Sequence, residues 1–229
     1  LDHPGIVRMV DAGVAQDGRP FLALEFVAGQ TLDAWLESAR PDALQRLSIF
    51  ARVCDAVAYA HQRLLVHRDI KPANLMIGLD GAPKLLDYGI ARLLDDGAAG
   101  TLTRDFGSSL TPAYAAPEQL RGEPVTTATD VHGLGLMLFQ MLCGGHPFLR
   151  DGRRGEALRR ALIETDAPSI LHEPGLLPMP RAWRDDLDRI VAMALEKDPA
   201  RRFASARELA EDVRAVLAGR PVRARRATR

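Results

Sequence analysis

A small set of polar residues is suited to moving a phosphoryl group: Asp69, Lys71, Asn74 and Asp87. Such a transfer needs a positioned hydroxyl, metal ions on the phosphates and a site poor in water. One carboxylate accepts the hydroxyl proton and a second holds the metal. Asp69 and Asp87 suit these two tasks if a hairpin between them brings their loops side by side. Asn74 offers a neutral oxygen for a second Mg²⁺, and Lys71 can offset the charge of the transferred phosphate.

Three motifs follow one another around these residues: His67-Arg68-Asp69 with Asn74, then Asp87-Tyr88-Gly89, then Ala116-Pro117-Glu118. Each triplet alone is weak, but all three in this order are highly specific. The sequence resembles the catalytic core of the eukaryotic-type protein kinases, bacterial branch. Tyr stands where the second triplet usually has Phe. The resemblance implies ATP and Mg²⁺ (or Mn²⁺) as cofactors, with Asn74 and Asp87 as metal ligands and Asp69 as the catalytic base.

The residues near Asp69 also resemble the Ser/Thr class of that family. Lys71 stands where tyrosine kinases usually lack a lysine. Thr111, three residues before Tyr114, resembles the substrate-binding threonine, which hydrogen-bonds to both Asp69 and Lys71. Leu110 precedes it where many kinases have Gly. The implied activity is transfer of the γ-phosphate of ATP to Ser or Thr hydroxyls of protein substrates.

By the same resemblance, adenine binds at the segment 24–27. Leu24 is the implied gatekeeper, and the backbone of Glu25 and Val27 pairs with the adenine edge. Met76 is implied to pack under the ring, and Asp87 contributes through the metal. These residues also read as ordinary core positions, which is compatible with the implied role.

Other residues are implied to hold the site together. Asp130 resembles the aspartate that receives backbone N–H groups of the catalytic loop. Glu118 is implied to pair with Arg202 as a buried ion pair. His67 is expected to stack with Tyr88 and Met9 between two lobes, so it is interpreted as structural rather than as a general base.

Regulation by phosphorylation is a further hypothesis. Arg68 and Arg92 would form a basic pocket that a phosphate on the following loop neutralises. The candidate hydroxyls are those of Thr101, Thr103, Ser108 and Ser109. Autophosphorylation there, helped by self-association, is the favoured interpretation. The alternative is that these are solvated loop hydroxyls.

The hydrophobic pattern places strands first and helices after. Strands are expected at 6–10, 21–27, 75–77 and 84–86, with turn residues inside each pair. Helices are expected at 31–36, 42–62, 130–142, 153–164 and 183–196, and a final one opens at Ser205. Residues 95–112 read as a long loop. The predicted fold class is α+β and kinase-like, with a complete, mostly helical C-lobe.

No G-x-G-x-x-G occurs in the chain, and its few lysines all have other expected places. We therefore expect the glycine-rich loop, the strand lysine and its partner glutamate to lie before residue 1. The expected division is an N-lobe remnant and hinge at 1–27, the C-lobe at 28–218, and a basic linker or tail at 219–229. Because two strands make a poor small lobe, the isolated chain is expected to bind ATP weakly and turn over little.

The amino-acid composition limits which classes of binding partner can be expected. The formal net charge is zero, which gives no reason to expect nucleic acid or an anionic membrane as a partner. Two cysteines in apolar helical patterns are expected to be buried free thiols. No apolar stretch is long enough for a membrane span, so we expect a cytoplasmic catalytic domain whose gene product could be tethered downstream.

Two other functions fit parts of the sequence. A pseudokinase scaffold would explain the lysine missing from the visible chain, but such proteins often lose one of Asp69, Asn74 and Asp87. A small-molecule phosphotransferase of related fold would not be expected to carry Ala116-Pro117-Glu118 or the Arg202 partner. A glycine-rich loop and a strand lysine upstream would favour the enzyme.

Overall fold

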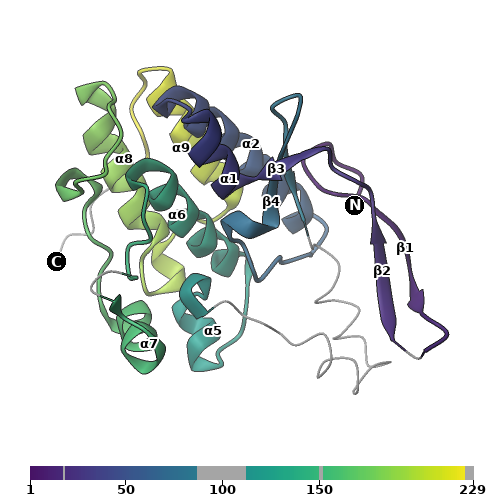
Figure 1. The fold of residues 1–229 in the computed structure, drawn as a ribbon. Coiled ribbons are helices and arrows are strands. Elements are labelled where there is room, and N and C mark those ends of the chain that lie inside the picture. Colours follow the sequence, from purple (N-terminus) through teal and green to yellow (C-terminus); the bar gives the residue numbers. More distant parts are fainter. Residues whose placement is uncertain (18, 87–111, 150–151, 225–229) are drawn as a thin grey trace.

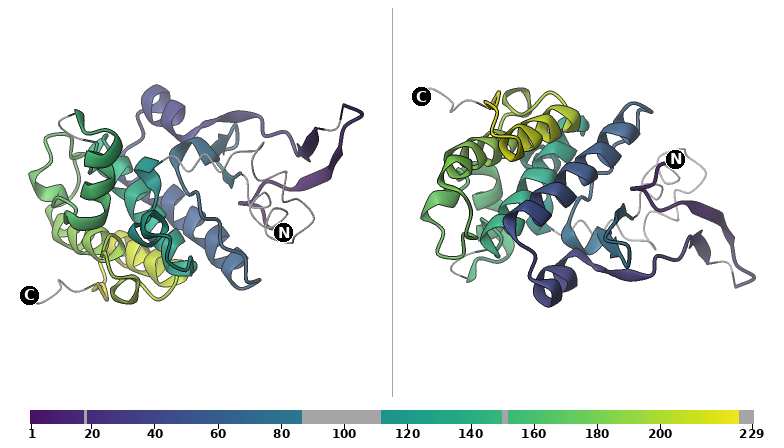
Figure 2. Two further views of the ribbon diagram at one scale, coloured as in Figure 1. Left: turned by 90° about the horizontal axis from the view of Figure 1, so that it is seen from below. Right: turned by 90° about the horizontal axis from the view of Figure 1, so that it is seen from above.

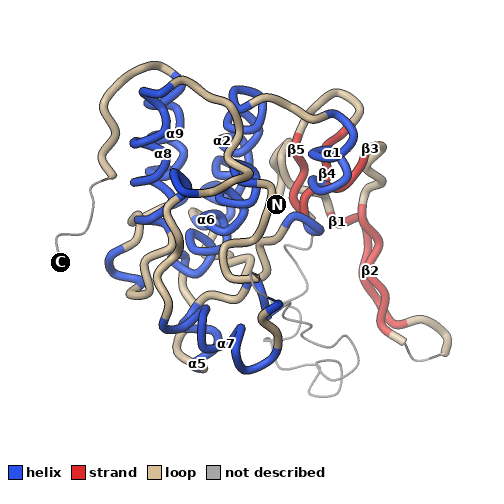
Figure 3. The backbone as a smooth tube through the Cα atoms, turned by 60° about the vertical axis from the view of Figure 1, so that its left-hand side comes forward, coloured by secondary structure: helices blue, strands red, loops and turns tan. Residues whose placement is uncertain are grey.

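The structure is a computed structural model that describes residues 1–17, 19–86, 112–149 and 152–224. The strands are β1 (Met9–Val14), β2 (Pro20–Leu24), β3 (Gly29–Thr31), β4 (Leu75–Gly78) and β5 (Pro83–Leu85). The helices are α1 (Leu32–Ala39), α2 (Ala43–His61), α5 (Pro117–Arg121), α6 (Thr127–Cys143), α7 (Gly155–Glu164), α8 (Arg181–Ala194) and α9 (Ala206–Leu217). Short 3₁₀ turns lie at Pro72–Asn74, Pro112–Tyr114, Ile170–His172 and Pro199–Arg201. The strands gather on one side of the helices, which confirms the α+β class (Figures 1 and 3).

β1 and β2 form the predicted antiparallel pair, with an irregular register between Met9 and Asp11. The predicted bounds 6–10 and 21–27 are only partly right. Ile6 and Val7 are buried and pair with β5 instead, because the Val7 N–H donates to the Leu85 carbonyl at 2.9 Å. One apolar run therefore serves two sheets, and its local pattern carries no sign of the division.

A second sheet has the order β3–β4–β5, and all its neighbours are antiparallel. The β4–β5 hairpin matches the prediction, with Gly81 at a φ of 73° in its turn. β3 was not predicted, since Gly29 was interpreted as the end of the preceding strand. Glycine is required there because a Cβ would come within 2.2 Å of the Ile77 carbonyl oxygen.

α2 is the amphipathic helix that the sequence predicts at 42–62. Asp42 caps it, accepting the Gln45 N–H at 2.8 Å, and the Gln45 side chain accepts the Asp42 N–H at 3.0 Å. Its apolar stripe, including Phe50 and Cys54, is fully buried. The helix lies alongside α9 (Figure 2, right). Both cysteines are buried, and no disulfide joins them, as expected.

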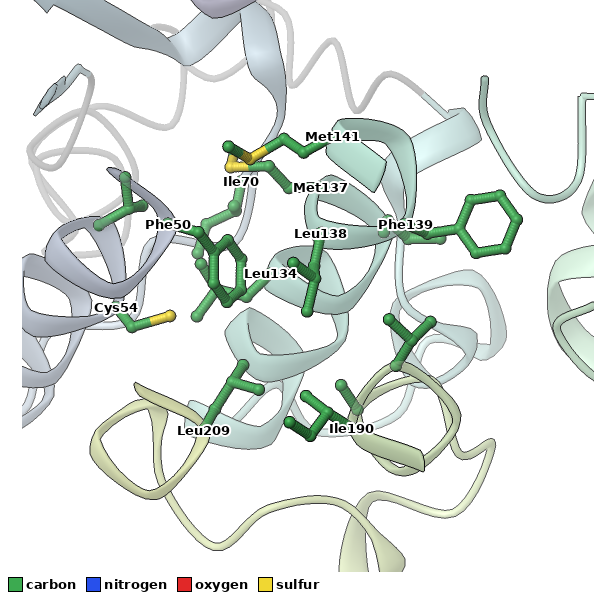
Figure 4. Packing of buried hydrophobic residues seen from close by; sticks show 14 of the residues in the cluster. Phe50, Cys54, Ile70, Leu134, Met137, Leu138, Phe139, Met141, Ile190 and Leu209 are labelled. Carbon is green, nitrogen blue, oxygen red and sulfur yellow. The ribbon is translucent and has the colours of Figure 1, made fainter. Parts of the chain in front are cut away.

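α6 is the buried central helix predicted at 130–142. Its side chains pack against Phe50 and Cys54 of α2. They also pack against Ile190 of α8 and Leu209 of α9 (Figure 4). Gly144, at a φ of 72°, ends it in the left-handed conformation that favours glycine. α6 thus packs against α2, α8 and α9, and its first turn is part of this core element.

The other helices differ from prediction mainly at their ends. Thr31 caps α1 as expected, but the helix continues to Ala39 rather than Leu36. Ser205 caps α9 by accepting the Glu208 N–H at 3.2 Å. α5 was not predicted, because its five residues are too few to show a period.

The segment after α9 packs back onto that helix. The buried carboxylate of Asp212 accepts the backbone N–H groups of Arg223 at 3.0 Å and Ala224 at 2.8 Å. Ala224 belongs to the main hydrophobic core. The first part of the expected tail is thus attached to the helical lobe.

Leu64 gives a prediction about stability. It follows α2 with a φ of 60° and is 92% exposed. A left-handed backbone costs a non-glycine residue about 1–2 kcal/mol. We expect Leu64→Gly to raise the free energy of unfolding by about 1 kcal/mol, measured by urea denaturation. Leu44→Gly is the matched control: this exposed leucine lies in the first turn of α2, where glycine should lower stability by up to about 1 kcal/mol. Equal effects of the two substitutions would contradict the argument.

Two buried histidines predict an acid-sensitive fold. Both ring nitrogens of His132 and the Nε2 of His146 find no hydrogen-bond partner among the described residues. Burial, and then the charges of Arg202, Lys197 and His146, hold the pKa of His132 well below its usual value. Burial lowers the pKa of His146 from 6.5 to about 4.

Because these pKa values are lowered in the folded chain, the unfolded chain takes up protons first as the pH falls. The stabilisation is therefore complete above pH 6.5. Below it, each histidine should cost about 1.4 kcal/mol per pH unit, down to about pH 4 for His146. Urea denaturation at pH 8 and between pH 6.5 and 5 measures this. His132→Phe should lower the slope of the free energy of unfolding against pH, below pH 6.5, by the contribution of one proton. The difference between variant and wild type at pH 8 measures the effect of the substitution on packing alone. An unchanged slope would refute the linkage.

Candidate active site

The catalytic-loop segment 67–74 is fastened to the start of α6. The buried carboxylate of Asp130 accepts the backbone N–H groups of His67 and Arg68, each at 2.8 Å. His61, at the end of α2, places its Nε2 2.7 Å from the same carboxylate. The expectation that Asp130 receives the loop's N–H groups is confirmed. Asp130 therefore attaches the catalytic-loop segment to the start of α6.

Three of the predicted residues meet within this loop. The Lys71 Nζ lies 2.6 Å from the Asp69 Oδ2. The Asn74 Nδ2 donates to the same Oδ2 at 3.0 Å and to the Asp69 carbonyl at 2.9 Å. A 3₁₀ turn at Pro72–Asn74 brings Asn74 back to Asp69. The Asp69 side chain remains 32% exposed, so a reactant can still reach it.

The loop is also tied to the residue just before Asp87. The Leu86 N–H donates to the Asn74 carbonyl at 2.9 Å, and the Leu86 carbonyl lies 2.8 Å from the His67 Nε2. His67 is therefore a buried linker, which agrees with its interpretation as structural. Asp87 and Thr111 lie outside the described residues, as do Tyr88, Arg92 and the four candidate phosphorylation sites Thr101, Thr103, Ser108 and Ser109.

The predicted adenine-binding residues border the two sheets. Leu24 ends β2, Glu25 and Val27 follow it, and Met76 lies on β4; all four are partly exposed. The Glu25 N–H donates to the Arg8 carbonyl at 2.9 Å.

An ion pair that sequence reasoning missed joins the two sheets. The Lys84 Nζ lies 2.5 Å from the Glu25 Oε1. The hydrogen bond from Lys84 holds the pKa of Glu25 below its usual value. Lys84 is also the cross-strand partner of Met76, so the pair places the segment after β2 beside β4. Nothing in either residue's local pattern signalled the contact.

The implied pair between Glu118 and Arg202 is confirmed. Their four charged atoms form two parallel contacts of 2.7 and 2.8 Å, and both side chains are almost wholly buried. Thr129 donates a further hydrogen bond to Glu118 at 2.8 Å. Burial alone would raise the pKa of Glu118, but the hydrogen bonds and charge of Arg202 outweigh it and lower the pKa. The pair joins α5 to the segment before α9.

Comparison with known sequences identifies the family of this chain. Residues 1–213 match the family described as protein kinase domain. The chain belongs to the protein kinase family. A probable serine/threonine-protein kinase of Streptomyces coelicolor is 36% identical over 226 residues, which cover 97% of this chain and 32% of that protein. Serine/threonine-protein kinase PknB of Mycobacterium leprae is 36% identical, covering 96% of this chain and 35% of its own length.

PknB of Mycobacterium tuberculosis is similar to the same degree, at 35% identity over 96% of this chain and 34% of that protein. The chain thus spans about a third of the length of these curated kinases. As a family, protein kinases use ATP and a divalent metal ion to phosphorylate proteins. Within the described ranges, no helix is long and apolar enough to cross a membrane.

Proposed function

We propose that this chain carries the catalytic lobe of an ATP-dependent protein serine/threonine kinase that phosphorylates Ser and Thr hydroxyls of proteins. The observation that supports it most is the contact of Lys71 and Asn74 with one carboxylate oxygen of Asp69, on a loop fastened to Asp130. A carboxylate held in this way is positioned to accept a proton from an incoming hydroxyl. The names of the relatives support the choice of serine and threonine.

In this proposal Asp69 accepts the proton of the substrate hydroxyl as its oxygen attacks the γ-phosphorus of ATP. Lys71 stays beside Asp69 and offsets the negative charge of the phosphoryl group being transferred. Thr111 would hydrogen-bond to both of these residues and hold the acceptor segment. The bond to the β-phosphate oxygen breaks, and ADP leaves.

Asn74 and Asp87 are the proposed ligands of Mg²⁺ or Mn²⁺. The amide nitrogen of Asn74 donates to Asp69, so the amide oxygen is the atom that can coordinate a metal ion. Hard cations such as Mg²⁺ prefer oxygen ligands. Among the described residues, no group of three or more His, Cys, Asp or Glu side chains could hold a metal. A bound metal ion would neutralise phosphate charge.

Adenine is proposed to lie against Leu24 and Met76 and to pair with the backbone of Glu25 and Val27. We retain 1–27 as the N-lobe remnant and hinge, 28–218 as the C-lobe and 219–229 as a linker or tail whose first part, up to Ala224, packs on the C-lobe. Autophosphorylation at Thr101, Thr103, Ser108 or Ser109, with self-association of two copies, remains a proposal that phosphopeptide mapping can test. We place the catalytic domain in the cytoplasm, where ATP is available.

The test is transfer of labelled γ-phosphate by the full-length gene product to itself and to generic protein acceptors, followed by phosphoamino acid analysis. We expect phosphoserine and phosphothreonine without phosphotyrosine. Binding of ATP without any transfer would instead favour the scaffold function. Label on tyrosine alone would contradict the serine/threonine assignment.

A further inference from the structure

Gln119 makes two hydrogen bonds that join parts of the site far apart in sequence. It is the third residue of α5, and its Oε1 accepts the Ala116 N–H at 2.9 Å. Glutamine often makes this contact at the third position of a helix. Gln45 makes the same contact at the third position of α2, where its Oε1 accepts the Asp42 N–H at 3.0 Å. The oxygen of Gln119 therefore has an ordinary capping role.

The amide nitrogen of Gln119 does something else. The Nε2 donates to the Arg68 carbonyl at 2.8 Å. Arg68 immediately precedes Asp69 and has a φ of 72°, a left-handed conformation that costs a non-glycine residue free energy. Such a conformation persists when surrounding contacts over-determine it. The Arg68 N–H is held by Asp130, so α6 and α5 fix this residue from two directions.

The Arg68 carbonyl and the Asp69 N–H belong to one planar peptide unit. Orienting the carbonyl therefore orients the first backbone atoms of Asp69, whose N–H is 3.3 Å from the His67 Nδ1. The side chain of Gln119 must accept at Ala116 and donate at Arg68 together. An amide serves both, whereas a carboxylate serves only the first.

We propose that Gln119 is a positioning residue for Asp69, which ties the placement of α5 to the orientation of the Arg68–Asp69 peptide. The inference rests on the proposed role of Asp69 as proton acceptor. It adds a direct link between the Ala116-Pro117-Glu118 segment and the catalytic loop. A shift of α5 would then reach the catalytic loop through one side chain.

Gln119→Glu tests this link in the full-length gene product. The glutamate keeps the oxygen that caps Ala116, but it turns a second oxygen toward the Arg68 carbonyl. We expect kcat to fall on the order of tenfold or more while the KM for ATP changes little, because small misplacements of a reacting group cost up to about 100-fold. Gln45→Glu is the matched control, with the same substitution at the same helical position, and it should leave kcat unchanged.

The outcomes separate this inference from the proposed function. If the wild type is active, Asp69→Asn is inactive and Gln119→Glu equals the wild type, the link is overturned and the function stands. If the wild type transfers no phosphate, the proposed function fails, and amide hydrogen exchange of this chain decides the structural link. Faster exchange at residues 67–70 in Gln119→Glu, but not in Gln45→Glu, supports the link, and unchanged exchange overturns it.

Discussion

Replacing Asp69 by asparagine should lower kcat of the full-length gene product by about 1,000-fold, within the range that general base catalysis contributes. Asparagine has the same size and keeps an oxygen that can accept from Lys71 and Asn74. It cannot take up the proton of the attacking hydroxyl. The loss should therefore appear in the chemical step. Steady-state kinetics with labelled ATP measure it, and circular dichroism checks that the fold is kept.

The control for this substitution is Asp42→Asn. Asp42 caps α2, and asparagine caps helices about as well as aspartate. Its kcat should equal that of the wild type. If Asp69→Asn kept more than about a tenth of wild-type kcat, Asp69 could not be the base that the expected range requires.

The sequence predicted the parts of this fold whose information is local. The long helix α2 was found because its apolar residues recur at helical spacing, and α6 because its long segment is apolar nearly all round. The closeness of Asp69, Lys71 and Asn74 could be expected from the sequence for a similar reason. All three residues lie within one loop of six residues, so their spacing limits how far apart they can be.

Contacts between distant segments were predictable only through the family resemblance. That resemblance implied the pair of Glu118 with Arg202, and the structure bears it out. The division of residues 6–10 between two sheets and the strand β3 depend on partners far along the chain. No local pattern records such pairing, because a short apolar run suits either sheet equally well.

Sequence reasoning also missed Gln119. Its side-chain amide combines an acceptor oxygen with a donor NH₂ group. The oxygen bonds to Ala116, three residues away, and the nitrogen bonds to Arg68, 51 residues away. A glutamine after a proline and a glutamate reads as an ordinary helix-starting residue. Only the fold reveals that its nitrogen meets the carbonyl of Arg68.

Removing the guanidinium of Arg202 should have the largest effect on stability. All five of its N–H groups donate: to both carboxylate oxygens of Glu118 and to the carbonyls of Ala128, Glu196 and Lys197. Arg202→Met would leave the Glu118 carboxylate buried without its partner. Losing one member of a buried pair costs about 3–5 kcal/mol. We expect a loss of this size in the free energy of unfolding, measured by urea denaturation at pH 8.

Two variants identify the cause of that loss. Arg223→Met removes a guanidinium whose pair with Glu211 is largely exposed, and it should cost no more than about 1 kcal/mol. The double variant Glu118→Met with Arg202→Met removes both charges and should recover part of the stability, since a buried pair replaced by apolar residues is often tolerated. A double variant no more stable than Arg202→Met alone would show that the backbone contacts of Arg202, rather than the stranded carboxylate, carry the effect. The stability that the double variant regains over Arg202→Met therefore measures the contribution of charge compensation to the contact between α5 and the segment before α9.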